Sequence, residues 1–238
     1  MEYNIDHFLD EVEKLGIELS EEQIWQFLTY YEMLVEKNKV MNITAITDFD
    51  EVIEKHFLDS ISLIKVYDTS KTISVLDMGT GAGFPGIPLK IAFPNLKIIL
   101  ADSLNKRVLF LQEVIEELGL SDIEAIHGRA EDLANNKEYR EKYDLVVSRA
   151  VANLSTLSEY CLPFVKMGGM FISYKSGECD EEVLNAKSAI FLLGGSIKDV
   201  TKFELGESGR SFISIEKVKG SPKKYPRKAG MPSKDPIK

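Results

Sequence analysis

The spacing of apolar and polar positions divides the chain into two parts with different periods. Up to about residue 68, apolar side chains recur every three or four residues, which is typical of amphipathic helices. The spacing predicts helices over 4–15 and 50–67, and another that begins at the capping box Ser20–Gln23 and ends before a loop at 38–48. We therefore expect an N-terminal helical extension over residues 1–68.

From Ile73 onward, short apolar runs alternate with helical patterns. Such alternation predicts an α/β core over residues 69–218, built on a mostly parallel seven-stranded sheet that helices cover on both faces. A short connection at 206–209 joins the last two strands, so the last strand is expected to run antiparallel. Strands are expected at 73–77, 97–101, 123–127, 143–148, 168–174, 197–204 and 210–217, and helices at 86–92, 103–118, 152–164 and 179–193.

Composition narrows the class of protein. At 238 residues with 44% hydrophobic side chains, the chain suits one domain with a substantial core. It has no apolar run of about 18 residues, and its first residues do not resemble a signal peptide. Cys161 and Cys179 lie far apart, and no cluster of His and Cys has metal-ligand spacing. We expect a cytoplasmic monomer without a membrane segment or a metal ion.

The charge of the chain is unevenly distributed. The formal net charge is −9, which at first argues against a nucleic-acid partner. Residues 217–238, however, hold eight Lys or Arg and one acid, so they carry +7 and the other residues carry −16. A basic tail over 219–238 can contact phosphates while the acidic body avoids non-specific binding, although a disordered, solvated tail is the more ordinary interpretation.

The most informative motif spans Ile73–Gly86, where an apolar run ends in Asp77 and glycines follow at 79, 81, 83 and 86. Glycines allow positive φ and let a ligand approach the backbone closely. A second strand ends in Asp102, which lies 21 positions after Gly81, close to the spacing of an acid that binds ribose hydroxyls. The motif therefore predicts a cofactor that contains a nucleoside.

The residues around the glycines discriminate between cofactors. A dinucleotide places its pyrophosphate at the helix N-terminus, where the Asp77 carboxylate would repel it. The same carboxylate suits the cationic amino-acid end of S-adenosylmethionine, and the chain has no Gly-Lys-Ser/Thr for a nucleotide triphosphate. S-adenosylmethionine is thus favoured over a nicotinamide cofactor, and a tight turn without a ligand is the third alternative.

Two further strand ends complete the expected site, since ligands of parallel sheets lie beyond the carboxyl ends of the strands. Gly128–Asp132 could hydrogen-bond the adenine edge, form a helix N-cap, or do both. Arg149 is expected to contact cofactor or substrate, with a salt bridge to Asp77, Asp102 or Glu131 as the alternative.

Absent motifs narrow the chemistry to a nucleophile that needs no activation. The Asn/Asp-Pro-Pro-Tyr run of exocyclic-amine methylation is missing near 148–151, and Cys161 is expected within a helix, away from a nucleophile position. A purine ring nitrogen such as guanine N7 fits, because it has an in-plane lone pair and no proton to lose. Alignment and electrostatics could then supply most of the catalysis. Methylation of a small molecule remains the alternative.

Motifs spread over nearly the whole length resemble the bacterial small-subunit ribosomal RNA guanine-N7 methyltransferase family, known as RsmG or GidB. The motifs are Met41–Ile46, Lys55–Ser60, Val75–Pro88, Asp102–Arg107, Gly128–Glu131, Ser148–Val151 and Tyr225–Gly230. The resemblance implies a class I S-adenosylmethionine-dependent methyltransferase fold. It also implies methylation of one guanine of 16S ribosomal RNA, position 527, either in naked RNA or in the small ribosomal subunit or its precursor.

The resemblance and the motifs together assign roles to individual residues. Arg149 and His56 are the candidate catalytic residues, and we expect His56 to position RNA because N7 methylation requires no base. The candidate cofactor contacts are Asp77, Gly79, Gly81, Phe84, Asp102, Ser103, Leu104, Ala130, Glu131 and Arg149. The candidate RNA contacts are Asn42, His56, Lys106, Arg107, Arg129, Lys175, Lys223, Lys224, Arg227 and Lys228.

Overall fold

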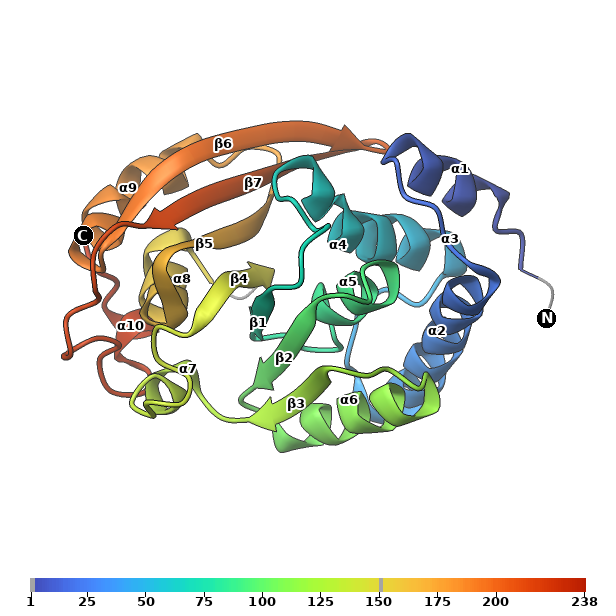
Figure 1. The fold of residues 1–238 in the computed structure, drawn as a ribbon, viewed down its shortest axis with the longest axis horizontal. Helices are drawn as coiled ribbons and strands as arrows, with labels where there is room; N and C mark the ends of the chain where they lie inside the picture. The colour runs from blue at the N-terminus through green and yellow to red at the C-terminus, as the bar shows by residue number, and fades with distance from the viewer. Residues whose placement is uncertain (1–2, 150–151) are drawn as a thin grey trace.

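The computed structural model describes residues 3–149 and 152–238 and has an α/β architecture (Figure 1). Its seven strands form one sheet in the order β3-β2-β1-β4-β5-β7-β6. The neighbouring pairs from β3 to β5 are parallel, and β7 is antiparallel to both β5 and β6. The predicted sheet and its antiparallel last strand are confirmed, although that strand lies between two others and not at the edge. The strands are β1 (Ser74–Met78), β2 (Lys97–Asp102), β3 (Ile123–His127), β4 (Tyr143–Arg149), β5 (Val165–Ser176), β6 (Gly195–Leu205) and β7 (Ser208–Lys217).

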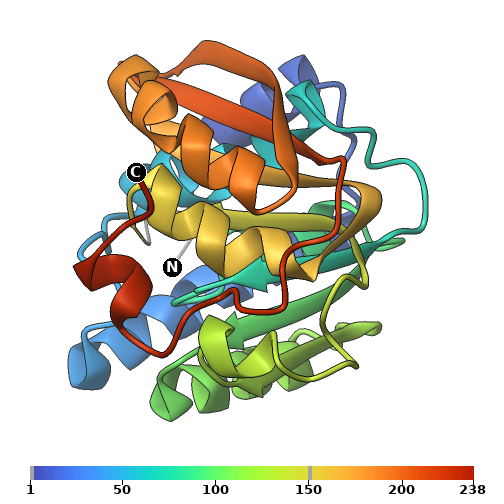
Figure 2. The same ribbon diagram turned by 90° about the vertical axis from the view of Figure 1, so that its left-hand side faces the viewer.

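Helices cover both faces of the sheet, and the alternation of side chains along each strand supplies two hydrophobic cores. On one face, Val75 and Val147 pack with α5 (Gly86–Ala92), α6 (Asn105–Glu117) and the N-terminal helices. On the other face, Leu76 and Val146 pack with α7 (Ala130–Leu133), α8 (Leu154–Cys161), the following 3-10 turn (Leu162–Phe164) and α9 (Asp180–Leu192). Figure 2 shows α8 and α9 side by side across this second face.

The N-terminal extension is helical as predicted, but its second helix ends later than expected and its third is irregular. The helices are α1 (Asp6–Lys14) and α2 (Glu21–Met41), and Ser20 and Gln23 form the predicted capping box. α2 runs four residues into the predicted loop because Asn42 ends it in a left-handed conformation, φ 32°. The third predicted helix is a succession of α3 (Phe49–Val52), a π-helical segment (Ile53–Leu58), α4 (Asp59–Ile61) and a 3-10 turn (Ser62–Lys65).

The N-terminal helices share their core with the sheet. Phe27 and Phe57 are fully buried in the same cluster as Leu100 of β2 and Phe110 of α6. The proposed boundary at residue 68 therefore does not separate two hydrophobic cores. The cluster fixes the π-helical segment, which carries His56, against the carboxyl end of the sheet.

The C-terminal residues after β7 lie along the face of α7 and α8 and end beyond α10 (Met231–Lys234) (Figure 2). Tyr225 is buried, and Arg140 donates hydrogen bonds to the carbonyls of Ser221, Pro222 and Tyr225. Lys217 is fully buried and donates to the Leu162 carbonyl and the Ser221 hydroxyl, so its charge does not reach the surface. The alternative of a disordered, solvated tail is wrong for this segment.

Candidate active site

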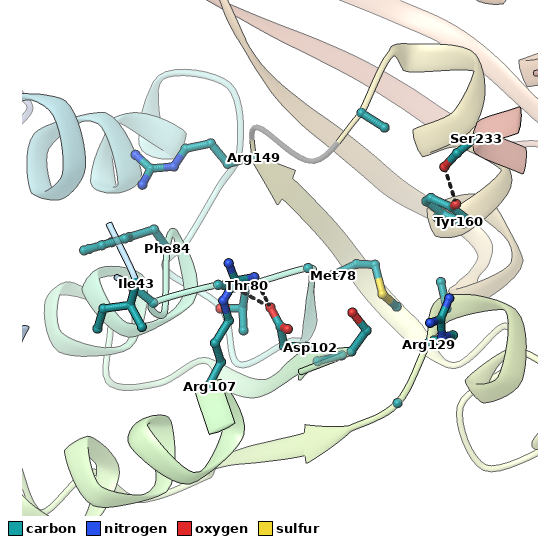
Figure 3. Close-up of a pocket in the computed structure, with 18 of the residues that line it drawn as sticks. Ile43, Met78, Thr80, Phe84, Asp102, Arg107, Arg129, Arg149, Tyr160 and Ser233 are labelled. Carbon is teal, nitrogen blue, oxygen red and sulfur yellow. Dashed lines mark hydrogen bonds and ion pairs between the residues drawn. The ribbon is translucent and has the colours of Figure 1, made fainter. Parts of the chain in front are cut away.

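A cavity of about 560 Å³ opens at the carboxyl ends of β1, β2, β3 and β4 (Figure 3). Its lining contains residues from each of the four predicted strand ends, because the carboxyl ends of parallel strands meet at one edge of a sheet. Eleven of the predicted site residues line it: His56, Gly79, Gly81, Phe84, Asp102, Ser103, Arg107, Arg129, Ala130, Glu131 and Arg149.

The glycine loop forms one wall and has the conformation that the sequence indicated. Gly79 and Gly81 have φ values of 73° and 63°, which β-carbons disfavour. A β-carbon added to Gly81 would meet nothing within 4 Å, so the space next to this backbone is open to a ligand. Glycine is required at position 86 for a different reason. A β-carbon there would lie 2.2 Å from Leu100 Cδ2 and prevent the loop from packing on β2.

Asp102 joins the second strand end to the glycine loop. Its Oδ2 accepts a hydrogen bond of 2.9 Å from the Gly81 N–H, and its Oδ1 accepts one of 2.9 Å from the Leu104 N–H. Arg107 adds an ion pair at 3.4 Å. The 21-residue spacing seen in the sequence is therefore a direct contact, and it holds a carboxylate at the cavity wall where ribose hydroxyls could bind it.

The prediction that Asp77 faces the cofactor is wrong. Asp77 is fully buried beneath the loop and does not line the cavity. Its Oδ2 accepts hydrogen bonds from the Thr80 hydroxyl at 2.6 Å and from the Gly86 N–H at 2.9 Å, while Oδ1 has no partner. The carboxyl therefore shapes the loop from below, and burial raises its pKa to about 7 despite those two bonds.

Arg149 lies at the opposite end of the cavity from the Tyr160 side (Figure 3) and is held by the N-terminal extension. Its Nη1 donates to Asp59 Oδ2 at 2.7 Å and to the Lys55 carbonyl at 2.9 Å. Its guanidinium carbon lies 5.0 Å from the centre of the Phe84 ring. The alternative that Arg149 pairs with Asp77, Asp102 or Glu131 is wrong, because its ion-pair partner is Asp59.

His56 is packed between the same groups. Its ring stacks on Phe84 with centroids 4.4 Å apart, Nε2 lies 3.0 Å from Thr44 Oγ1, and Nδ1 lies 3.2 Å from Arg149 Nη2. Burial and then the Arg149 charge lower the pKa of His56 to about 3. The imidazole is therefore neutral at physiological pH.

The far side of the cavity is formed by α7, α8 and the C-terminal segment (Figure 3). Glu131 Oε1 accepts a hydrogen bond of 3.0 Å from the Gly230 N–H, and the Tyr160 hydroxyl lies 2.8 Å from Ser233 Oγ. Arg129 is exposed at the rim. Nothing in the sequence pattern placed Tyr160, Gly230 or Ser233 at the cavity, because their proximity to it depends on packing between distant segments.

Comparison with known proteins places the chain in a family. A family model described as rRNA small subunit methyltransferase G, or GidB, matches residues 23–211. A protein named ribosomal RNA small subunit methyltransferase G from Lachnoclostridium phytofermentans is 53% identical over 232 residues, which cover 97% of this chain and 96% of the relative. The chain belongs to the rRNA small subunit methyltransferase G family. A protein with the same name from Lysinibacillus sphaericus is 50% identical over 236 residues, covering 98% and 99% of the two chains.

Solved structures confirm the fold. A SAM dependent methyltransferase from Aquifex aeolicus matches with a TM-score of 0.55 at 20% identity, over 73% of this chain and 96% of that chain. The class I methyltransferase fold is thus confirmed. Together with membership of the rRNA small subunit methyltransferase G family, it confirms S-adenosylmethionine as the cofactor.

The predicted contact residues that do not line the cavity differ in how exposed they are. Asn42 and Lys106 are exposed, and Leu104 is 42% exposed outside the cavity. Lys175 is engaged by Glu182 at 2.6 Å and by the Ala152 carbonyl at 2.8 Å. Ala150 and Val151 of the Ser148–Val151 motif lie outside the described residues. Gly128, which the sequence placed at a strand end of the site, also lines the cavity. The lining residues to which the sequence assigned no individual role are Ile43, Thr44, Met78, Thr80, Ala82, Ala101, Ala152, Tyr160, Gly230 and Ser233.

Two further observations concern the membrane segment and the metal ion that the sequence analysis did not expect. Within the parts of the chain that the structure describes, no helix is both long and apolar enough to cross a membrane. Across residues 3–149 and 152–238, no three His, Cys, Asp or Glu side chains are grouped so that they could hold a metal ion. The monomeric state and the cytoplasmic location stay predictions.

The buried Asp77 carboxyl predicts a pH-dependent stability. Because its folded pKa is raised, its contribution is fully present below the unfolded pKa near 4 and is lost as the pH rises through about 7. In Asp77→Asn this loss disappears, so the variant should gain more than about 1 kcal/mol relative to the wild type between pH 4 and pH 8. Urea unfolding at both pH values measures the difference. The exposed Asp10→Asn serves as the control, and parallel curves for Asp77→Asn and wild type would contradict the assignment.

Proposed function

We propose that this protein transfers the methyl group of S-adenosylmethionine to N7 of one guanine of 16S ribosomal RNA, position 527, directly and without a metal ion or a covalent intermediate. One observation carries the proposal. A single cavity has the Asp102 carboxylate and an open glycine backbone on one wall, and a guanidinium and a neutral imidazole at its end. Bound S-adenosylmethionine supplies an electrophilic methyl group on a sulfonium.

The residues present fit that cofactor. Gly81 leaves open space beside its backbone, and the Asp102 carboxylate is fixed by two N–H groups, so neither must rearrange to receive an adenosine. Glu131 borders the far side of the cavity. The carboxylates at the wall favour a cationic ligand over a pyrophosphate, which supports S-adenosylmethionine over a dinucleotide.

The side chains near the end of the cavity support direct transfer to a nucleophile that has no proton to lose. His56 has a pKa of about 3 and touches the Arg149 guanidinium, so the surroundings oppose a positive charge on its ring. None of the described residues that line the cavity is a cysteine, and burial raises the pKa of the Cys161 thiol well above its ordinary value. Guanine N7 fits these surroundings, because its lone pair needs neither a base nor covalent activation by the protein.

The rim of the cavity supports a polyanionic substrate. Arg107 and Arg129 border the opening, and Lys106 is exposed on the first turn of α6. Cations around a cavity in an otherwise acidic molecule favour binding of phosphates at this place over others. Family membership and these cations favour RNA over the small-molecule alternative.

The decisive experiment identifies the modified atom. Small ribosomal subunits and naked 16S ribosomal RNA, both lacking the modification, are incubated with the enzyme and S-adenosylmethionine. The RNA is then cleaved chemically at N7-methylguanine and mapped by primer extension. We expect one new stop at the nucleotide following position 527, in at least one of the two substrates. Incorporation of labelled methyl groups without chemical cleavage would assign the reaction to another atom and overturn the N7 proposal.

His56→Ala tests the role of the neutral imidazole. Losing the ring removes the stack on Phe84 and the contact with Thr44, so the loop that follows the candidate RNA contact Asn42 loses its support. We expect the KM for RNA to rise at least about tenfold, because small displacements at such sites have large effects. Since His56 stays neutral, kcat of the wild type should show no titration of this group between pH 5 and pH 8.

The control for His56→Ala is His7→Ala, which removes an exposed imidazole from α1 and should leave both constants unchanged. A loss of kcat in His56→Ala with unchanged RNA affinity would contradict a positioning role and point to a direct part in the transfer.

A further inference from the structure

We propose that the C-terminal segment 225–235 is a wall of the cofactor site, so that binding of the cofactor and the placing of the RNA-facing lysines on this segment are coupled. The inference rests on the proposed function and adds that binding of the cofactor and binding of the RNA influence each other. Gly230 and Ser233 line the same cavity as Gly81 and Asp102, although they follow them by more than 125 positions in the chain. On this side the segment completes a wall to which α7 contributes Glu131 and α8 contributes Tyr160.

The inner side of the segment is bonded to residues of the cavity. The Gly230 N–H donates to Glu131 Oε1 at 3.0 Å, and Ser233 Oγ lies 2.8 Å from the Tyr160 hydroxyl. The Thr156 hydroxyl donates to the Pro232 carbonyl at 3.0 Å. A cofactor that contacts Glu131 therefore contacts a carboxylate that is already shared with the segment. Figure 3 shows Tyr160 and Ser233 together at the end of the cavity that lies away from Phe84.

One buried carboxylate anchors the segment. Glu159 of α8 is fully buried, and it accepts hydrogen bonds from three donors of Arg227: the backbone N–H at 2.7 Å, Nε at 3.0 Å and Nη2 at 2.7 Å. A charge so placed needs its partner, since removing one member of a buried pair leaves the other uncompensated. Arg227 was expected to contact RNA; in the structure its guanidinium is bonded to Glu159 and to the Asp235 carbonyl, with 24% of the side chain exposed.

The outer side of the same segment carries solvent-exposed lysines. Lys223, Lys224 and Lys228 flank the inward Arg227 and are all exposed. Because Glu159 holds Arg227 in place, it also restricts where these neighbouring lysines lie relative to the cavity. Lysines held in one place contact a polyanion at a lower entropic cost than lysines on a disordered tail.

The segment after Arg227 is held mainly by polar contacts. Pro232 is buried, whereas Lys228, Ala229, Gly230 and Met231 are exposed. Regions with few buried apolar contacts open at a lower free energy than the rest of a protein. A ligand that fills the cavity and contacts the closed segment stabilises it, and by linkage the closed segment strengthens binding of the ligand.

Limited proteolysis of the full chain tests the coupling without measuring activity. Trypsin cleaves after Lys228 within the segment and after the exposed Lys39 in α2. Saturating S-adenosylhomocysteine, which lacks the transferable methyl group, should slow cleavage after Lys228 at least about fivefold and leave cleavage after Lys39 unchanged. Equal rates after Lys228 with and without the ligand would overturn the inference.

Two substitutions test the reciprocal effect on ligand affinity, measured by calorimetry with S-adenosylhomocysteine. Gly230→Pro removes the N–H that bonds Glu131, and its ring is incompatible with the φ of 81° at this position. Arg227→Met combined with Glu159→Leu removes the anchor without leaving a buried charge. Each should raise the Kd at least about fivefold, while Lys234→Ala, which removes an exposed cation from the same segment, should stay within about twofold.

The outcomes separate this inference from the proposed function. A wild-type protein that does not bind S-adenosylhomocysteine would overturn both. A wild-type protein that binds it, with Gly230→Pro and the double variant binding equally well and melting at the wild-type temperature, would overturn the coupling alone.

Discussion

The position of Arg149 at the end of the cavity depends on one buried carboxylate. Asp59, at the start of α4, binds Arg149 of β4 through Oδ2 at 2.7 Å and Arg210 of β7 through Oδ1 at 2.9 Å. Two guanidiniums so close together repel each other unless an anion lies between them, so the carboxylate is what allows both to stay. Through this contact, the irregular N-terminal helices determine where the positive charge at the end of the cavity lies. The extension therefore forms part of the cavity wall, and the π-helical segment that carries His56 is in turn held by the hydrogen bond from Arg149 to the Lys55 carbonyl.

The two strand-end acids illustrate how similar sequence positions take different roles. Both follow apolar runs, and both accept backbone N–H groups from the glycine-rich region. Asp102 does so from the cavity wall, where one side of its carboxyl can still meet a ligand. Asp77 does so from beneath the loop, where nothing but protein surrounds it and burial raises its pKa. A negative charge at the cavity therefore comes from Asp102 and Glu131, and Asp77 contributes the shape of the turn.

The parts of this structure that the sequence predicts are those with a local signal. Apolar runs and turn residues located the seven strands, and the spacing of Gly81 and Asp102 anticipated a contact between neighbouring parallel strands. The partner of Arg149 could not be found in this way, because Asp59 lies 90 residues earlier on a helix whose packing no periodicity specifies. The same is true of Gly230 and Ser233. For Asp77, the sequence placed the residue correctly but not the direction of its side chain, which depends on how closely Gly86 approaches β2.

Buried carboxylate–arginine pairs lie across both of the expected boundaries at 68 and 218. Asp59 joins the N-terminal extension to β4 and β7, and Glu159 of α8 joins the core to Arg227 of the C-terminal segment. Such pairs contribute little net stability compared with apolar packing, since the desolvation of the charges offsets their attraction. These pairs instead fix the orientation of the arginine side chains, because a planar guanidinium bonded through two nitrogens tolerates few orientations. In this molecule the first pair fixes Arg149 at one end of the cavity, and the second fixes Arg227 in the segment whose Gly230 and Ser233 line the other end. A chain with a net charge of −9 can thereby present positive charge to a polyanion at chosen places.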